Sequence, residues 1–153
     1  HLTLKFLGDI PEDLVAAIGK AIEAATRQQR PMKLVISGLG VFPGARKARV
    51  IWAGLSGATA DLMALQGAVD AALEEAGFAP ERRRFKPHLT LGRFKKPPPA
   101  QKLLAVLAHR SEYTPIEMHL DRVALYRSEL RPQGARYTSL AQATLNPGAF
   151  GTV

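Results

Sequence analysis

The stretch KPHLTLGRF (residues 86–94) contains the sequence His-Leu-Thr-Leu, and the same four residues open the chain at positions 1–4. Side chains alternate between the two faces of an extended strand. Each copy therefore predicts a strand with its histidine and threonine on one face and its leucines, Leu91 among them, turned toward a core. A site built from both strands contains two imidazoles and two hydroxyls.

The sequence around the two copies is also repeated. His88 follows His1 by 87 positions and Arg136 follows Arg49 by the same interval, while Tyr126 follows Phe42 by 84. Each half has the pattern strand, helix, strand, strand. We predict a duplicated, two-lobed α+β fold, in which two antiparallel sheets flank a central cleft and helices cover the outer faces. The single domain spans residues 1–153, with half-repeats over about 1–57 and 86–146 and a linking helix over 58–77.

Hydrophobic periodicity and turn residues predict the individual elements. Helices are expected from Asp9 to Gln29, from Ser56 or Thr59 to Gly77, and over residues 100–109. Strands are expected over residues 1–8, 32–41, 49–55, 86–94, 116–126 and 136–145. A break is expected at Gly38 or Gly40, and a loop over residues 127–135.

The chain is strongly basic, with a net charge of +8 and a pI near 10.2. Lys and Arg cluster in one loop, before the second histidine and after it, at Arg46, Lys47, Arg49, Arg82, Arg83, Arg84, Lys86, Arg93, Lys95 and Lys96. This clustering favours an anionic substrate such as nucleic acid over a role of the charge in solubility alone.

Composition also indicates the cellular compartment in which the protein is expected. The chain has no cysteine, which excludes disulfides and thiol chemistry and fits a reducing cytoplasm. No apolar run approaches the roughly 20 residues of a membrane span. We expect a cytoplasmic monomer that does not interact with membranes.

Two histidines in matching surroundings suit acid–base chemistry. A histidine has an unperturbed pKa near 6.5, so a neutral imidazole and an imidazolium can coexist near neutral pH. General base and general acid catalysis need this pair. Threonine hydroxyls and arginines suit a phosphate whose negative charge grows toward a five-coordinate transition state. We interpret His1 and His88 as catalytic, one activating water and the other protonating a leaving alkoxide.

A metal site is the competing interpretation. Catalytic zinc is usually held by three protein ligands, and no Asp, Glu or Cys lies two positions from His1 or His88. We therefore predict no metal and no other cofactor. A lone histidine on a helix or strand is more simply explained by packing, and this interpretation is kept for His109 and His119.

Five segments together carry a resemblance to a known family. They are the two His-Leu-Thr-Leu motifs, Phe42-Pro43, Arg49-Val50-Ile51-Trp52, and the stretch over residues 128–137, which begins with Ser128-Glu129-Leu130 and ends with Gly134-Ala135-Arg136-Tyr137. They resemble the RNA 2′,3′-cyclic phosphodiesterases, also called 2′-5′ RNA ligases, of the two-histidine phosphoesterases. The resemblance implies metal-free hydrolysis of a ribose 2′,3′-cyclic phosphate at an RNA end to a 2′-phosphomonoester, with reversible 2′-5′ joining of RNA ends. Members of this family have a strand and a helix before the first motif, so an upstream segment is expected.

The resemblance also implies roles for individual residues. His88 is assigned as the base that activates water and His1 as the acid to the 3′ oxygen, and Thr3 and Thr90 bind the phosphate. Arg49 and Arg93 are candidate contacts to phosphate or the RNA backbone. Phe42 and Tyr126, at equivalent loop mouths, are candidates for stacking on a base or for packing at the rim.

Other functions are left open by the same residues. The expected partners are RNA ends or small cyclic nucleotides, which includes ADP-ribose 1″,2″-cyclic phosphate. A further alternative is a non-catalytic module that binds RNA in the same basic cleft.

Overall fold

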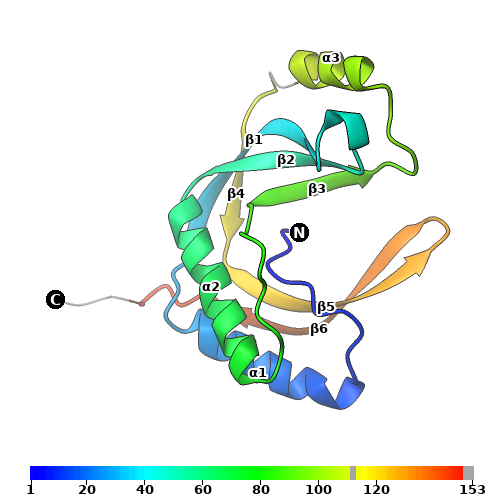
Figure 1. Cartoon of the computed structure of the whole chain (residues 1–153). Helices are drawn as coiled ribbons and strands as arrows, with labels where there is room; N and C mark the ends of the chain where they lie inside the picture. The colour runs from blue at the N-terminus through cyan, green and yellow to red at the C-terminus, as the bar shows by residue number, and fades with distance from the viewer. Residues whose placement is uncertain (111–112, 150–153) are drawn as a thin grey trace. The chain divides into compact units, whose positions relative to one another are not determined.

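The computed structural model describes residues 1–110 and 113–149 (Figure 1). The elements are η1 (Glu12–Leu14), α1 (Val15–Thr26), β1 (Met32–Phe42), η2 (Ala45–Lys47), β2 (Val50–Gly57), α2 (Thr59–Glu75), β3 (His88–Arg93), α3 (Ala100–Arg110), β4 (Ile116–Leu120), β5 (Arg122–Arg131) and β6 (Gly134–Thr144). One sheet has the strand order β3-β2-β1-β4, and β5 and β6 form a second sheet. The predicted α+β class with two sheets is confirmed.

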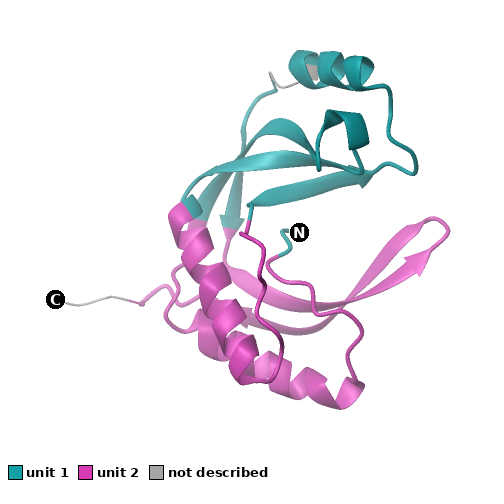
Figure 2. Cartoon of the chain, viewed as in Figure 1, with its two compact units in different colours: residues 1–3, 33–59, 86–119 teal, residues 4–32, 60–85, 120–153 magenta. Residues whose placement is uncertain are grey.

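The chain forms two compact units (Figure 2). Unit 1 comprises His1–Thr3, Lys33–Thr59 and Lys86–His119, and holds the four-stranded sheet, η2 and α3. Unit 2 comprises Leu4–Met32, Ala60–Phe85 and Leu120–Val153, and holds α1, α2 and the β5–β6 hairpin. Each unit takes segments from both halves of the chain, so the units do not coincide with the half-repeats expected over 1–57 and 86–146.

Unit 1 is built on the long antiparallel hairpin of β1 and β2. The register shifts between Ser37 and Leu39, where Gly38 has a φ of +70°, a conformation that glycine adopts readily. The predicted break is therefore present at Gly38. Leu34 and Ala53 are buried in this hairpin, and Ala48 is buried in the loop that joins its strands. α3 packs against η2 in that loop.

Unit 2 is organised around α1 on the β5–β6 hairpin. Apolar residues at helical spacing are buried on α1 (Ile18, Ile22, Ala25) and on α2 (Leu62, Leu65, Val69, Leu73). α1 approaches β6 closely, because a Cβ at Gly19 would lie 3.4 Å from the Ala141 Cβ. Among the described residues, no helix combines the length and apolar character needed to cross a membrane.

Residues 1–8 form no strand, so the prediction of a first strand was wrong. No described strand pairs with this segment, and an extended backbone needs such a partner for its hydrogen bonds. A side chain holds the segment instead. Lys5 forms an ion pair with Asp70 of α2 and donates to the carbonyl of Ala79 at 2.8 Å. The Lys5 side chain is only 7% exposed and that of Asp70 19%.

The region from residue 116 to residue 135 also differs from expectation. Residues 116–126 form two strands in different sheets, β4 and β5, with Asp121 between them. β5 then continues through the predicted loop to Arg131 and turns over Pro132-Gln133 into β6. Leu130 near the tip is 91% exposed. The hairpin end is exposed on both faces, so no hydrophobic alternation marks it as a strand.

Candidate active site

β3 carries the second histidine motif at the edge of the unit 1 sheet (Figure 1). Its register with β2 pairs His88 with Gly54 and Thr90 with Trp52. Directly paired residues of antiparallel strands point to the same face. His88, Thr90 and Trp52 therefore share one face of the sheet, which we call the His88 face.

A β-bulge in the pairing of β2 with β3 places one more residue of β3, Arg93, on the His88 face. The register shifts between Ile51 and Trp52, which leaves Leu91 without a direct partner and pairs Arg93 with Val50. Val50 and Trp52 lie on the same side of β2, so Arg93 lies on the His88 face together with His88 and Thr90. Without the bulge, the alternation of side chains along β3 would place Arg93 on the opposite face. The bulged Leu91 is 58% exposed, so the prediction that it anchors a core was wrong.

Two aromatic side chains surround the ring of His88. The Phe42 ring lies edge-on to it, with centroids 5.0 Å apart and an interplanar angle of 86°. The Trp52 ring lies at 6.3 Å and 63°, and the Phe42 and Trp52 centroids are 5.1 Å apart. Aromatic pairs of this kind contribute about 0.5–1.5 kcal/mol beyond the area they bury. These contacts fix the plane of the His88 imidazole.

The neighbouring residue Lys86 orients His88 further. The Nδ1 atom of His88 lies 2.6 Å from the backbone carbonyl oxygen of Lys86. A carbonyl oxygen only accepts, so this hydrogen bond requires the hydrogen to be on Nδ1. In the neutral ring Nε2 then carries the lone pair, and it is the atom that can exchange a proton with a ligand. The Lys86 ammonium adds positive charge 5.7 Å from the Phe42 centroid.

The position of the Trp52 ring requires a glycine at position 40, because the ring packs against the Gly40 backbone. The two residues are paired across β1 and β2. A Cβ at Gly40 would lie 2.1 Å from Cζ2 of Trp52 and 2.4 Å from Cη2. Any side chain at this position would therefore displace the indole, and with it the support of the His88 ring.

We expect Gly40→Ala to lower the free energy of unfolding by about 1–3 kcal/mol, the usual cost of overpacking. The substitution is also expected to shift the fluorescence of Trp52, the single tryptophan of the chain. Urea unfolding and emission spectra measure both effects. Gly67→Ala on α2 is the matched control, since its Cβ would meet nothing within 4 Å. Wild-type stability and emission in Gly40→Ala would contradict this placement of Trp52.

Arg49 links two loops of unit 1. Its Nη1 donates to the carbonyl of Lys95 at 2.9 Å. Its backbone N–H donates to the carbonyl of Phe42 at 2.8 Å, and its carbonyl accepts from Phe94 at 2.9 Å. A guanidinium has five N–H donors, so the bond to Lys95 is compatible with the predicted phosphate contact, which stays a prediction.

His1 and Thr3 belong to unit 1, as does β3 (Figure 2). Both are exposed and lie on irregular backbone. The two His-Leu-Thr-Leu motifs therefore differ locally, because only the second presents its histidine and threonine from a strand. The catalytic and phosphate-binding roles of His1 and Thr3 stay predictions.

Tyr126 lies in unit 2, within β5. Its ring packs against Tyr137 of β6, with centroids 6.3 Å apart and an interplanar angle of 82°. The placement of Tyr126 at a loop mouth was wrong, because the strand continues to Arg131. Stacking of Tyr126 or Phe42 on a base stays a prediction.

Sequence reasoning missed Gly40, Trp52 and the orienting carbonyl of Lys86 as parts of the site. Trp52 is the only tryptophan, and it lies on the strand expected to pair within the sheet. Lys86 precedes His88 by two positions, a spacing that permits a local bond from ring to backbone. The sequence alone does not show that these residues contact His88, because their positions depend on the register of β2 and β3.

The residues of the candidate site do not line the groove found in unit 2. A groove of about 1080 Å³ runs between α1 and β6 of unit 2, lined by residues that include Lys20, Arg127 and Asn146. None of the predicted site residues lines it. Within residues 1–110 and 113–149, no three His, Asp or Glu side chains gather in a group that could hold a metal ion.

Known structures share this fold. The crystal structure of TT0787 of Thermus thermophilus matches with a TM-score of 0.73 and 30% identity, over 95% of this chain and 77% of that one. E. coli LigT complexed with 3′-AMP matches with a TM-score of 0.69 at 23% identity, over 95% of this chain and 76% of that one, which shows the fold alone. The two matches show that this chain shares the fold of these structures.

Sequence comparisons identify the family to which the chain belongs. The model of the 2′-5′ RNA ligase superfamily matches residues 1–132. The RNA 2′,3′-cyclic phosphodiesterase of Methanothermobacter thermautotrophicus is 36% identical over 140 residues, which cover 92% of this chain and 75% of that protein. The enzyme of the same name from Aeropyrum pernix is 32% identical, over 92% of this chain and 78% of its own length. The chain belongs to the 2′-5′ RNA ligase superfamily.

Proposed function

We propose that this protein is a cyclic phosphodiesterase that hydrolyses the ribose 2′,3′-cyclic phosphate at an RNA end to a 2′-phosphomonoester, without a metal ion. The observation that carries the proposal is the orientation of His88. Its Nδ1 is held by the Lys86 carbonyl, and its ring is on the same face as Thr90 and Arg93. The names of the relatives, RNA 2′,3′-cyclic phosphodiesterases, support the same reaction.

The proposed reaction needs one base and one acid. Nε2 of His88 takes a proton from water as the water oxygen forms a bond to phosphorus. The bond between phosphorus and the 3′ oxygen breaks, and His1 donates a proton to that oxygen. The bond to the 2′ oxygen remains, so the product carries a 2′-phosphate and a free 3′-hydroxyl. A 5′-hydroxyl of RNA in place of water gives a 2′-5′ linkage by the same steps.

The phosphate is held by groups that stabilise its growing charge. Thr90 lies on the His88 face two residues from His88, and Thr3 is assigned the equivalent role beside His1. Arg93, at the other end of β3 on the same face, is a candidate contact to the RNA backbone. Fixed donors and positive charge stabilise a five-coordinate phosphorus more than the substrate, because the transition state has more negative charge. This preference adds to the rate enhancement expected from the acid and the base.

The proposal is tested by assaying the purified protein against a panel of cyclic phosphates with and without EDTA. The panel contains nucleoside 2′,3′-cyclic phosphates, RNA oligomers with that end, and ADP-ribose 1″,2″-cyclic phosphate. We expect hydrolysis of the 2′,3′-cyclic phosphates that EDTA does not change. RNA binding without turnover would contradict the enzymatic function. Loss of activity in EDTA that a divalent ion restores would contradict the metal-free mechanism.

We further propose that the protein acts as a monomer, because one chain supplies every residue of the His88 face. A chain without cysteine also fits our proposal that it acts in the reducing cytoplasm. Light scattering of the purified protein is expected to give the mass of one chain. A dimer whose dissociation removes activity would contradict this proposal.

A further inference from the structure

The net positive charge of the protein lies in one of its two units. Unit 1 contains ten Lys and Arg and two Glu, a net charge of +8, whereas unit 2 contains eleven basic and eleven acidic residues, a net charge of zero. Charge that serves only solubility has no reason to collect in one unit. The asymmetry indicates that unit 1 binds a polyanion.

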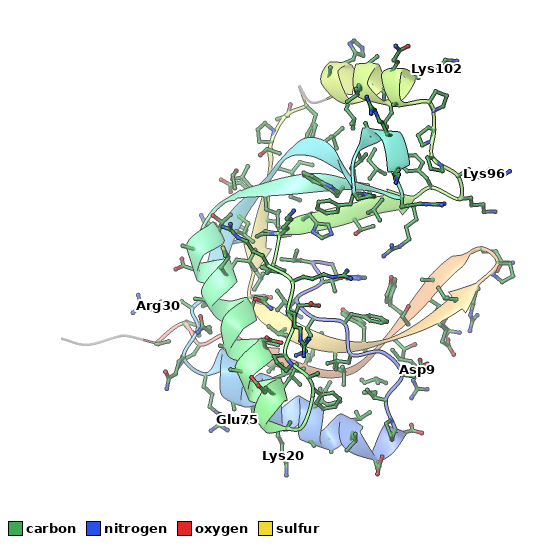
Figure 3. The ribbon with its side chains drawn as sticks, viewed as in Figure 1. Asp9, Lys20, Arg30, Glu75, Lys96 and Lys102 are labelled. Atoms are coloured by element: carbon green, nitrogen blue, oxygen red, sulfur yellow. The ribbon has the colours of Figure 1, made fainter. Side chains whose placement is uncertain are left out.

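Part of this charge gathers beyond the Arg93 end of β3. Arg46 and Lys47 lie on η2, and Lys95 and Lys96 lie in the loop that follows β3. All four side chains are exposed, and none takes part in the ion pairs of the described residues. We call these four residues the distal basic cluster. Figure 3 shows Lys96 extending outward from the loop between β3 and α3.

Hydrogen bonds hold the backbone of the two loops that carry the distal basic cluster. The bond from Arg49 to the Lys95 carbonyl and the bond from Phe94 to the Arg49 carbonyl, each 2.9 Å, tie its two loops together. Ala48 is fully buried next to Lys47, and α3 packs against η2. Loops that are already ordered lose less conformational entropy when they bind a ligand.

We propose, on the basis of the proposed function, that the distal basic cluster binds backbone phosphates of the RNA strand that leads to the cyclic end. His88 and Arg93 are five residues apart on β3, which is about 17 Å at ~3.3 Å per residue. The cluster lies beyond Arg93, too far for the single nucleotide whose phosphate is at His88 but within reach of a strand. Contacts to phosphate carry no sequence information, so the protein prefers longer RNA whatever its bases.

The salt dependence of binding measures these contacts. Each phosphate contact to a single strand contributes about −0.7 to the slope of log K against log salt concentration. Four contacts therefore predict a slope of about −2.8 from the cluster, which is about a 50-fold loss of RNA affinity between roughly 50 and 200 mM salt. A mononucleotide does not reach the cluster and shows a far smaller dependence.

The test compares the wild type with Lys95→Gln/Lys96→Gln. Affinity for a fluorescent RNA oligomer ending in a 2′-phosphate is measured by anisotropy over a salt series, so the readout does not need turnover. The double variant is expected to reduce the magnitude of the slope by about 1.4 and to leave hydrolysis of a nucleoside 2′,3′-cyclic phosphate within twofold of wild type. The matched control is Lys20→Gln on α1 combined with Arg27→Gln at the residue that follows α1, both exposed in unit 2, and it is expected to keep the wild-type slope.

Each outcome decides the proposal. An unchanged slope in Lys95→Gln/Lys96→Gln overturns it, as does an equal loss of slope in the α1 control. A double variant that loses mononucleotide hydrolysis as strongly as RNA binding also overturns it, because the residues then act at the reacting phosphate. A wild type that binds RNA with the predicted slope but hydrolyses neither substrate supports the cluster and refutes the cyclic phosphodiesterase function.

Discussion

Replacing His88 with alanine is expected to lower kcat for a nucleoside 2′,3′-cyclic phosphate by about 10²–10⁴-fold, the usual contribution of a general base. The variant keeps Thr90 and Arg93 on the same face, so KM is expected to change much less than kcat. Initial rates at saturating substrate measure the loss, and circular dichroism checks that the fold is retained.

His119→Ala is the matched control for this experiment. His119 is an exposed histidine on β4 of the same unit, and its removal is expected to leave kcat within twofold of the wild type. A His88→Ala protein that keeps more than a tenth of the wild-type kcat would contradict the role of His88 as the base.

Replacing Asp70 with alanine is expected to lower the free energy of unfolding by about 3–5 kcal/mol, because it leaves a buried ammonium without its partner. The Lys5 side chain is almost fully buried against Asp70. Asp70 also accepts hydrogen bonds from the backbone N–H of Glu81 at 3.2 Å. The substitution thus releases both the segment that follows the first histidine motif and the connector after α2. Urea unfolding measures the change.

Glu23→Ala provides the comparison for an ion pair at the surface. Glu23 and Arg27 form an exposed pair one helical turn apart, and such pairs contribute about 0.3–0.5 kcal/mol. The double substitution Lys5→Met/Asp70→Leu is expected to recover much of the loss of Asp70→Ala, since apolar side chains replace buried ion pairs well. An Asp70→Ala protein less than about 1 kcal/mol below the wild type would contradict the buried position of this pair.

The elements with strong periodicity and clear end signals could be predicted from the sequence. α2 runs from Thr59 to Glu75 and is followed by Gly77 at a φ of +93°, as its leucine spacing and terminal glycine indicate. The turn of the β5–β6 hairpin and the division of residues 116–126 into two strands could not be predicted. Exposed strands lack hydrophobic alternation, and a change of sheet at Asp121 depends on contacts distant in sequence.

The candidate site was predictable only in part, for a related reason. The shared face of His88 and Thr90 follows from alternation alone. The addition of Arg93 follows from a bulge, and the support of His88 by Trp52 follows from the register of β2. Neither is visible in local sequence. The same sequence, His-Leu-Thr-Leu, forms a strand at residues 88–91 but not at residues 1–4. The difference arises because residues 88–91 are hydrogen-bonded to β2, whereas no described strand pairs with residues 1–4.

The most direct test of the two-histidine account uses a 2′,3′-cyclic substrate whose bridging 3′ oxygen is replaced by sulfur. A thiolate leaves without protonation, so this substrate needs the base but not the acid. We predict that His1→Ala hydrolyses it within about tenfold of the wild-type rate, whereas His88→Ala keeps its loss of about 10²–10⁴-fold. Rescue of His88→Ala and not of His1→Ala would contradict the assignment of His88 as the base.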